Sequence, residues 1–404
     1  MNGLACEHSP GQIRPCILME ITQMSSKKKS VMVVCMVDSI HSARWLEIYR
    51  NKNIDFHIFP STPNRKIHPK IRNLVENSST IDGRFKLVYR LKYLAILLWI
   101  IDLVFGNRFR GYLISRYAKR HNVDIIHAVE LNHAGYMLSR ASSFGLPTGC
   151  KIIVTSWGSD IFWFNRYPKH RERLASVLSI ANEFISECSR DHKFATDLGF
   201  SGKFWKPTPV SGGYSDDFIK TTRTKTSMRK IILIKGYESF VGRASIALEA
   251  ILNLTDRLTE YEIHVYSANR KTQRLVKKLR LKKQLRIIVY KKHALTHEQM
   301  LSLFSKARVY LGVSLSDGIS VSLLESMVTG AFPIQTDTSC GNEWIVNGET
   351  GFIVKPNVDA VVNALRIAIS DDMLVDNAML KNSAQASERL DQAVIYSRLS
   401  NLYN

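Results

Sequence analysis

The sequence lacks the patterns that mark disulfide-stabilised, zinc-binding and membrane-spanning proteins. Its six cysteines are scattered with no Cys-x-x-Cys pair, so it predicts neither a zinc site nor a disulfide framework. No apolar run reaches the roughly 20 residues that a membrane-spanning helix needs. The longest candidate, Leu94 to Phe105, is interrupted by Asp102. The cysteine usage therefore favours a reducing, cytoplasmic setting.

Acidic residues are scarce relative to basic ones. The 404 residues include 35 Asp and Glu against 56 Lys and Arg, which gives a formal net charge of +21. A field of this sign favours polyanionic partners, such as nucleic acid, anionic lipid headgroups or phosphate-bearing substrates. Two stretches concentrate the charge: residues 84–121 hold nine basic residues and one acid, and residues 270–292 hold eleven and no acid.

The first basic stretch, residues 84–121, carries apolar residues at helical spacing and is predicted to form one or two amphipathic helices. The apolar positions are Leu87, Leu91, Leu94, Leu98, Ile101 and Phe105. Such a helix could lie in the headgroup plane of an anionic membrane, which is the partner that we expect. The alternative is a helix that faces the core and keeps its basic side in water. For residues 270–292 a solvated basic helix is the simplest interpretation.

The length and the order of the predicted elements indicate two domains. A chain of 404 residues is longer than a single hydrophobic core usually grows. Residues 1–29 show no periodicity and are predicted to be a disordered tail. From residue 30 onward, apolar strands alternate with helical stretches in two halves, with a Pro-, Gly- and Ser-rich segment near residue 215 between them. We therefore expect an α/β protein with two doubly wound, Rossmann-like domains, residues 30–215 and 216–385, that face each other across a cleft.

In the first predicted domain, polar loops follow the apolar strands, where an open α/β sheet presents its site residues. One loop follows the strand that ends at Val37, and two more follow the strands near residues 125 and 151. The alternative for Arg44 is a solvated side chain beside a buried Trp45. The candidates in these loops are His41, Arg44, His127, Glu130, His133, Trp157, Gly158 and Asp160.

In the second predicted domain, two cations flank a glycine-containing loop. Lys235 ends an apolar strand and Arg243 precedes a helix. Both side chains would point toward a diphosphate at the helix N-terminus, and Arg243 could bind it through two hydrogen bonds.

The segment Ser314 to Thr338 places two acids, Asp317 and Glu325, seven residues apart across a strand, a Gly/Ser loop and a helix N-terminus. The backbone N–H groups of Gly318, Ile319, Ser320, Val321 and Ser322 would be free to bind a phosphate. Glu325, about two turns into the helix, could accept hydrogen bonds from sugar hydroxyls. An ordinary strand-to-helix connection would show the same spacing.

The residues from Asp317 to Pro333 closely resemble the donor-site signature of the family 4 retaining glycosyltransferases, although the first acid is Asp where the family usually has Glu. The loops His41-Ser-Ala-Arg44-Trp45 and Trp157-Gly-Ser-Asp160 resemble the family's acceptor-side loops. In the loop from His127 to Glu130, Val129 stands where the family usually has a second histidine, so His133 or Glu130 would have to take the catalytic role of that histidine.

This resemblance implies a GT-B fold in which residues 386–404 form a helix that returns to the first domain. It implies transfer of a sugar from a nucleotide-diphosphate sugar, with retention of configuration and with no metal and no cofactor. Lys235, Arg243 and the loop amides would hold the phosphates, Glu325 the ribose and Asp317 the sugar ring. The implied acceptors are glycans or lipid-linked glycans of bacterial surface polysaccharide at the inner face of the membrane.

Two other functions fit parts of this pattern. A sugar-nucleotide epimerase can share the GT-B fold, because the fold alone does not determine the reaction. A basic nucleic-acid binder would fit the net charge, but the sequence has no recognition module or aromatic platform of the kind that such proteins use, and nucleic acid is not predicted as a partner.

Overall fold

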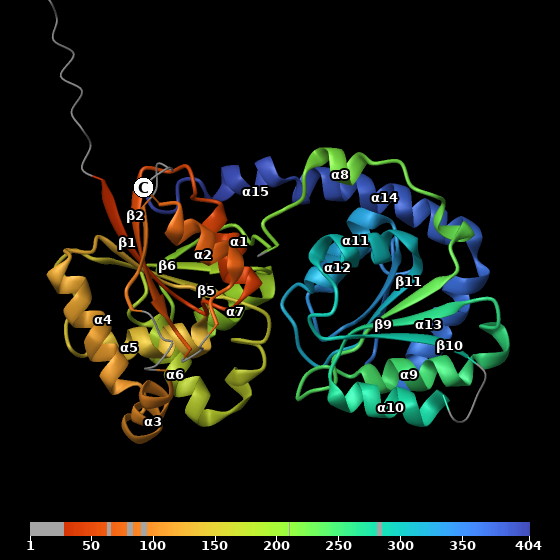
Figure 1. The fold of residues 1–404 in the computed structure, drawn as a ribbon, viewed down its shortest axis with the longest axis horizontal. Helices are drawn as coiled ribbons and strands as arrows, with labels where there is room; N and C mark the ends of the chain where they lie inside the picture. The colour runs from red at the N-terminus through yellow and green to blue at the C-terminus, as the bar shows by residue number, and fades with distance from the viewer. Residues whose placement is uncertain (1–27, 63–65, 79–83, 90–94, 210, 281–284) are drawn as a thin grey trace, which may run out of the picture.

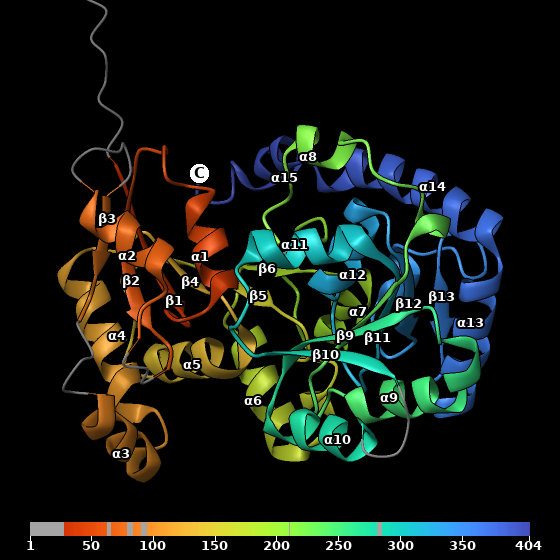
Figure 2. The same ribbon diagram turned by 45° about the vertical axis from the view of Figure 1, so that its right-hand side comes forward.

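The computed structural model describes residues 28–62, 66–78, 84–89, 95–209, 211–280 and 285–404, which form two α/β domains side by side (Figure 1). The predicted tail, residues 1–29, lies outside the described residues except for its last two. Each domain has a parallel sheet with helices on both faces, and helices α14 and α15 run along one side of the pair (Figures 1 and 2).

The first domain contains a seven-stranded sheet in the order β3-β2-β1-β4-β5-β6-β7, and all its neighbours pair in parallel. The first strand of the chain, β1, lies inside this sheet between β2 and β4 and is almost continuously apolar and buried, as expected for a sheet that is covered on both faces. The strands are β1 (Lys29–Cys35), β2 (Ile54–Pro60), β3 (Arg84–Leu87), β4 (Ile125–Ala128), β5 (Lys151–Ser156), β6 (Glu183–Ser186) and β7 (Lys203–Phe204). The helices are α1 (Ile40–Glu47), α2 (Pro69–Glu76), α3 (Ala95–Phe105), α4 (Arg108–Arg120), α5 (Tyr136–Ser142), α6 (Pro168–Leu178) and α7 (Ser189–Asp197).

The second domain contains a six-stranded parallel sheet in the order β10-β9-β8-β11-β12-β13. Its order reverses between β8 and β11, so the loops after these strands meet at the carboxyl edge of the sheet, where ligands of such folds bind. The strands are β8 (Ile231–Lys235), β9 (Glu262–Ala268), β10 (Arg286–Lys291), β11 (Ala307–Gly312), β12 (Phe332–Thr336) and β13 (Phe352–Val354). The helices are α8 (Asp216–Lys220), α9 (Ala244–Asn253), α10 (Arg270–Arg280), α11 (His297–Lys306), α12 (Val321–Thr329), α13 (Val358–Ser370), α14 (Asp372–Leu390) and α15 (Gln392–Leu399).

The prediction that residues 84–121 are entirely helical is wrong at its start. Residues Arg84–Leu87 form the edge strand β3, which pairs with β2. Phe85 is buried and stacks on Phe56 with ring centroids 4.9 Å apart, while Arg84 forms an ion pair with Asp55. Because strand pairing with β2 buries one side of this segment, tertiary contacts override the helical spacing of its leucines. The two helices of the stretch are α3 and α4.

The end of the chain packs against the first domain. Helix α14 runs along the second domain, and α15 then crosses to the first, where Tyr403 is buried among Trp45, Tyr49 and Phe56. The Tyr403 hydroxyl accepts a hydrogen bond from Trp45 Nε1 (3.1 Å). The last helix therefore ties the two domains together through an aromatic core.

None of the helices in the described ranges combines the length and the apolar character that crossing a bilayer requires.

Candidate functional site

The loop between β11 and α12, which carries Asp317 and Gly318, contacts the first domain. The Asp317 carboxylate accepts a hydrogen bond from the Gly318 N–H (3.0 Å). A Cβ atom added to Gly318 would lie 2.9 Å from Glu187 Oε2 and 3.2 Å from the Gly158 nitrogen, and both of these residues belong to the first domain. Only a residue without a side chain leaves room for this approach.

Lys235 lies beside the first acid of this loop. Its Nζ atom is 3.7 Å from Asp317 Oδ2 and 3.4 Å from Ser320 Oγ. Burial alone would lower the pKa of the Lys235 ammonium, but the carboxylates of Asp317 and Glu325 and neighbouring tyrosines outweigh it and raise this pKa. Lys235 is therefore a fixed positive charge at the carboxyl end of β8, directly opposite the start of α12.

The N-terminus of α12 presents unused backbone donors. Ser320 is the N-cap, and no side chain caps the helix there. Among the described residues, the N–H groups of 319–322 find no protein acceptor, as expected for the first turn of a helix. The side chains of Ile319 and Ser322 face inward, because Ile319 is buried in the core and Ser322 Oγ accepts from the Tyr266 hydroxyl (2.7 Å). These two residues can thus offer a ligand only their backbones.

Glu325 is buried in α12 with one carboxylate oxygen unsatisfied. Oε1 lies 3.1 Å from His297 Nε2, whereas Oε2 has no hydrogen-bond partner within the described part of the chain. The same His297 nitrogen lies 2.8 Å from Arg44 Nη2 of the first domain. A buried carboxylate oxygen without a partner is costly, so a hydroxyl donor from a ligand would stabilise it.

His41 and Trp157 line the first-domain side of this region. Their rings meet edge to face with centroids 6.0 Å apart. Burial, together with the positive charges of Arg44 and Lys235, lowers the pKa of His41 to about 4. His41 is therefore neutral at neutral pH. Its Nδ1 atom is buried and has no partner among the described residues, as is also true of Trp157 Nε1.

The loops around residues 130 and 157 are tied together by Asp160, whose carboxylate accepts from Leu131 N (2.9 Å), Asn132 Nδ2 (2.9 Å) and Trp157 N (3.2 Å). Burial raises the pKa of Asp160 to about 7 despite these bonds. Burial likewise raises the pKa of Glu130 to about 8, although the Ser61 hydroxyl donates to its carboxylate. Two acids in these loops can thus carry a proton near neutral pH.

Three predicted site residues lie away from this region, or their polar atoms already have hydrogen-bond partners in the protein. His127 is fully buried between Thr155 Oγ1 and the Tyr403 hydroxyl, each 2.7 Å away, so it stabilises the core and has no exposed atom for an acceptor. His133 is exposed in the short π-helix Leu131–Gly135 that precedes α5. The Arg243 guanidinium donates to the backbone carbonyls of its own loop, at Ser239 (2.5 Å) and Gly242 (2.9 Å), so a diphosphate would have to replace these acceptors.

Three residues at the site were not predicted from the sequence. Glu187 accepts from the Gly158 N–H (2.9 Å), and Arg190 donates to the Asp317 carbonyl oxygen (3.0 Å). Both follow the end of β6, so the rule that identified the other strand-end loops also applied to them. His297, which contacts Glu325, begins α11, and nothing in its local sequence distinguishes it.

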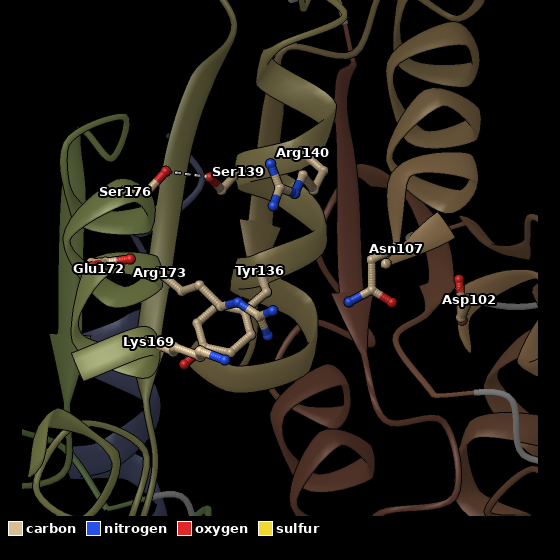
Figure 3. Close-up of a pocket in the computed structure, with 10 residues that line it drawn as sticks. Asp102, Asn107, Tyr136, Ser139, Arg140, Lys169, Glu172, Arg173 and Ser176 are labelled. Atoms are coloured by element: carbon tan, nitrogen blue, oxygen red, sulfur yellow. Dashed lines mark hydrogen bonds between the residues drawn. The ribbon is translucent and has the colours of Figure 1, made fainter. Parts of the chain in front are cut away.

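A separate cavity of about 500 Å³ lies on the first domain (Figure 3). Its polar lining comes mainly from α5 and α6, where Tyr136, Arg140 and Arg173 point into it. None of the predicted site residues lines this cavity. It is therefore distinct from the region around Asp317.

Residues 217–387 match a family model described as glycosyl transferases group 1. The second domain is a group 1 glycosyl transferase domain. The prediction of a glycosyltransferase is confirmed at the level of the group 1 family. Assignment to family 4 stays a prediction. A search of curated proteins found no match.

Solved structures that include a glycosyltransferase share the fold of both domains. A glycosyltransferase from Rickettsia africae is 15% identical with a TM-score of 0.62, over 93% of this chain and 98% of its own. HepE from Anabaena in complex with UDP-glucose is 13% identical with a TM-score of 0.66, over 92% and 98%. Sucrose-phosphate synthase from Thermosynechococcus elongatus is 12% identical with a TM-score of 0.66, over 93% and 98%. The prediction of two Rossmann-like domains in a GT-B arrangement is confirmed.

Proposed function

We propose that this protein is a retaining glycosyltransferase that moves a hexose from a nucleotide-diphosphate sugar to a glycan or a lipid-linked glycan of bacterial surface polysaccharide. The observation that carries the donor half of this proposal is the geometry around α12. A cation, a set of unused N–H groups and a buried, half-satisfied carboxylate lie together at one helix N-terminus. A nucleoside diphosphate offers the two phosphates and the ribose hydroxyls that match these groups.

The residues supply charge at the positions that sugar transfer needs. The departing diphosphate gains negative charge, which Lys235 and the amides of residues 319–322 would stabilise. The Oε2 atom of Glu325 would accept from a ribose hydroxyl. Asp317 would leave its ion pair with Lys235 to bind the transferred sugar, while the charge of Lys235 passes to the phosphates. Retention then follows from attack on the face that the diphosphate leaves, without an enzyme nucleophile.

The acceptor would enter from the first domain, beside His41, Arg44, Trp157 and Gly158. Glu130 and Asp160, whose pKa values are raised to about 8 and about 7, lie in the loops behind this face. Because His127 is buried and Val129 replaces the family's second histidine, we assign no histidine of this loop to the transferred sugar.

We further propose that helices α3 and α4 dock this cytoplasmic enzyme on the anionic inner face of the membrane. Leu97, Ile100, Val104 and Phe105 of α3 are 47–69% exposed, and exposed arginines of α4 lie close by. A groove of about 420 Å³ between the two helices is lined by apolar side chains together with Arg116 and Arg120. In both views α3 lies at one end of the first domain, apart from the second domain (Figures 1 and 2). Apolar anchors beside basic residues are the combination that anionic lipid surfaces bind.

A panel of nucleotide sugars measured by thermal shift tests the donor assignment, because a ligand that binds the folded state raises its melting temperature. We expect one nucleoside diphosphate and its sugar conjugates to raise the melting temperature of the wild type. The same compounds should not raise the melting temperature of Lys235→Ala. If no nucleotide in the panel stabilises the protein, the donor site is refuted. Release of a new free nucleotide sugar in the absence of any acceptor would instead identify an epimerase.

Sedimentation with vesicles tests the membrane surface. We expect binding to vesicles that contain phosphatidylserine, and its loss in Val104→Ser/Phe105→Ser and in high salt. Met373→Ser/Leu380→Ser is the matched control, because these two side chains of α14 are 77% and 68% exposed but lie on the other domain. Equal binding of both double variants would refute the assignment to α3.

A further inference from the structure

Two cysteines from different domains meet directly beside the donor loop. Cys188 follows β6 in the first domain, and Cys340 follows β12 in the second. Their Sγ atoms and a carboxylate oxygen of Glu343 all lie within 4.8 Å of one another. Both cysteines are buried, with 0% and 2% of their surface exposed. The fold thus brings together two thiols that the sequence leaves far apart.

This pair is connected to the donor site through the backbone on both sides. The Cys340 N–H donates to the Gly318 carbonyl oxygen (2.9 Å). On the other side Cys188 directly follows Glu187, whose carboxylate faces Gly318. Next to the thiols, the Ser189 N–H donates to Glu343 Oε1 (2.9 Å), which is a further link between the domains. A covalent bond here would hold the donor loop against the first domain.

We propose that Cys188 and Cys340 form a reversible interdomain disulfide by exchange with a small-molecule disulfide, and that this bond holds the two domains closed. One thiolate attacks a sulfur of the small disulfide, which forms a mixed disulfide and releases one small thiol. The second thiolate then displaces the other small thiol and completes the Cys188–Cys340 bond. Two protein thiols are oxidised, one small disulfide is reduced to two thiols, and the thiol protons end on those products.

The burial of the thiols determines when this exchange takes place. Contact with the Cys340 thiol, together with burial, raises the pKa of the Cys188 thiol, so the closed protein holds an unreactive thiol there. A small disulfide can reach the sulfur atoms only when the domains separate. The first exchange therefore belongs to the open protein, and closure brings the second sulfur into position.

A metal ion is the other ligand that two cysteines and a glutamate could take, and two features disfavour it. Both carboxylate oxygens of Glu343 already accept from Ser189, from its N–H (2.9 Å) and from its Oγ (3.5 Å). The guanidinium of Arg190 lies close enough to both thiols for their charges to interact. A divalent cation would have to displace the Ser189 hydrogen bonds from Glu343, and the positive charge of Arg190 would repel it.

Formation of the bond is tested in the full chain without any activity measurement. After incubation with oxidised glutathione, intact mass and peptide mapping should show loss of two hydrogen atoms and a Cys188–Cys340 crosslink that dithiothreitol reverses. Cys188→Ser and Cys340→Ala should each abolish the crosslink, while Cys150→Ser should retain it. Crosslinks through other cysteines, glutathione adducts without a Cys188–Cys340 bond, or stoichiometric zinc that Cys188→Ser removes would each overturn the proposal.

The consequence of the bond rests on the proposed glycosyltransferase activity. Because turnover needs the domains to part and release product, we expect the oxidised wild type to lose about tenfold or more in kcat, with recovery on reduction. Cys188→Ser should keep its activity both after treatment with oxidised glutathione and after reduction. A crosslinked protein with undiminished kcat would overturn the locking effect. Absence of any transfer in the reduced enzyme would count against the proposed function and leave the mass measurement as the test of the disulfide.

Discussion

The guanidinium of Arg190 in the first domain donates a hydrogen bond to the backbone carbonyl oxygen of Asp317 in the second, over 3.0 Å. The same side chain pairs with the buried Asp191 (3.1 Å) and stacks on Phe162, 4.0 Å from the ring centroid. Arg190 is therefore held rigidly in its own domain while it contacts the loop that carries the first acid of the donor signature. It links the first domain directly to the backbone that positions Asp317.

Replacing this side chain should affect turnover more than the fold. We expect Arg190→Lys to keep the ion pair with Asp191 but to lose the fixed geometry of the guanidinium, and so to lower kcat by about tenfold. Steady-state kinetics with the donor identified by thermal shift would measure this. A change confined to the acceptor KM would contradict a role at the donor loop.

A side chain at Gly318 should keep the domains apart. In Gly318→Ala the new methyl group would lie 2.9 Å from Glu187 Oε2 and 3.2 Å from the Gly158 nitrogen, so the closed arrangement cannot form without a shift. We expect a larger radius of gyration in small-angle scattering and a loss of transfer, with little change in melting temperature. Gly149→Ala is the control for domain closure, because nothing lies near its Cβ; its φ of +74° strains an alanine, so its melting temperature should fall while the radius of gyration and transfer stay unchanged. A closed, active Gly318→Ala enzyme would refute the argument.

The unsatisfied oxygen of Glu325 predicts a specific loss of donor binding. We expect Glu325→Gln to fold and to lose about 1–1.5 kcal/mol of nucleotide affinity, because a charge-assisted hydrogen bond becomes a weaker neutral one. Isothermal titration with the nucleoside diphosphate measures this. His297→Gln, which alters only the Oε1 side of the carboxylate, should have a smaller effect, and the reverse order would contradict the assignment of Oε2 to the ligand.

The buried Glu130 predicts a stability that falls as pH rises. Its pKa is raised from an ordinary 4.5 to about 8, so between these values the folded state binds one proton more than the unfolded state. The free energy of unfolding should therefore decrease by roughly 1.4 kcal/mol per pH unit from this group as the pH rises from 5 toward 8. Urea denaturation at pH 5.5, 6.5 and 7.5 (about one unit apart) would measure the slope. Glu130→Gln should reduce this slope and leave the part that comes from Asp160, and an unchanged slope would contradict the buried, protonated state.

The aromatic contact of the last residues predicts a stability role for Tyr403. Tyr403→Phe would leave Trp45 Nε1 and His127 without their shared partner, which we expect to cost about 1–3 kcal/mol of unfolding free energy. Denaturant unfolding measures the loss. Tyr167→Phe, at a position that is 46% exposed, is the matched control and should change nothing. Equal stability of both variants would mean that the crossing of α15 does not depend on this hydroxyl.

Local sequence was sufficient to predict that the residues of the proposed donor half lie together. Lys235, Asp317 and the start of α12 lie at strand ends, and a parallel sheet brings the carboxyl ends of β8 and β11 to one edge whatever the rest of the chain does. The two-domain organisation followed from length and alternation in the same way. The early part of the first basic stretch was predicted wrongly, because pairing of Arg84–Leu87 with β2 is a long-range effect that helical spacing cannot reveal.

The sequence by itself thus determined the fold class and the position of the loop that we propose binds phosphate, since both depend on periodicity and on residues that are neighbours in the chain. Only the tertiary structure decided which of the candidate side chains face one another. Arg190 and Asp317, 127 residues apart, and the thiols of Cys188 and Cys340 meet because two separately folded domains close on each other. His127, which sequence placed at the site, is buried because a tyrosine from the far end of the chain packs against it. Contacts between domains depend on how the surfaces fit, and no local pattern encodes that.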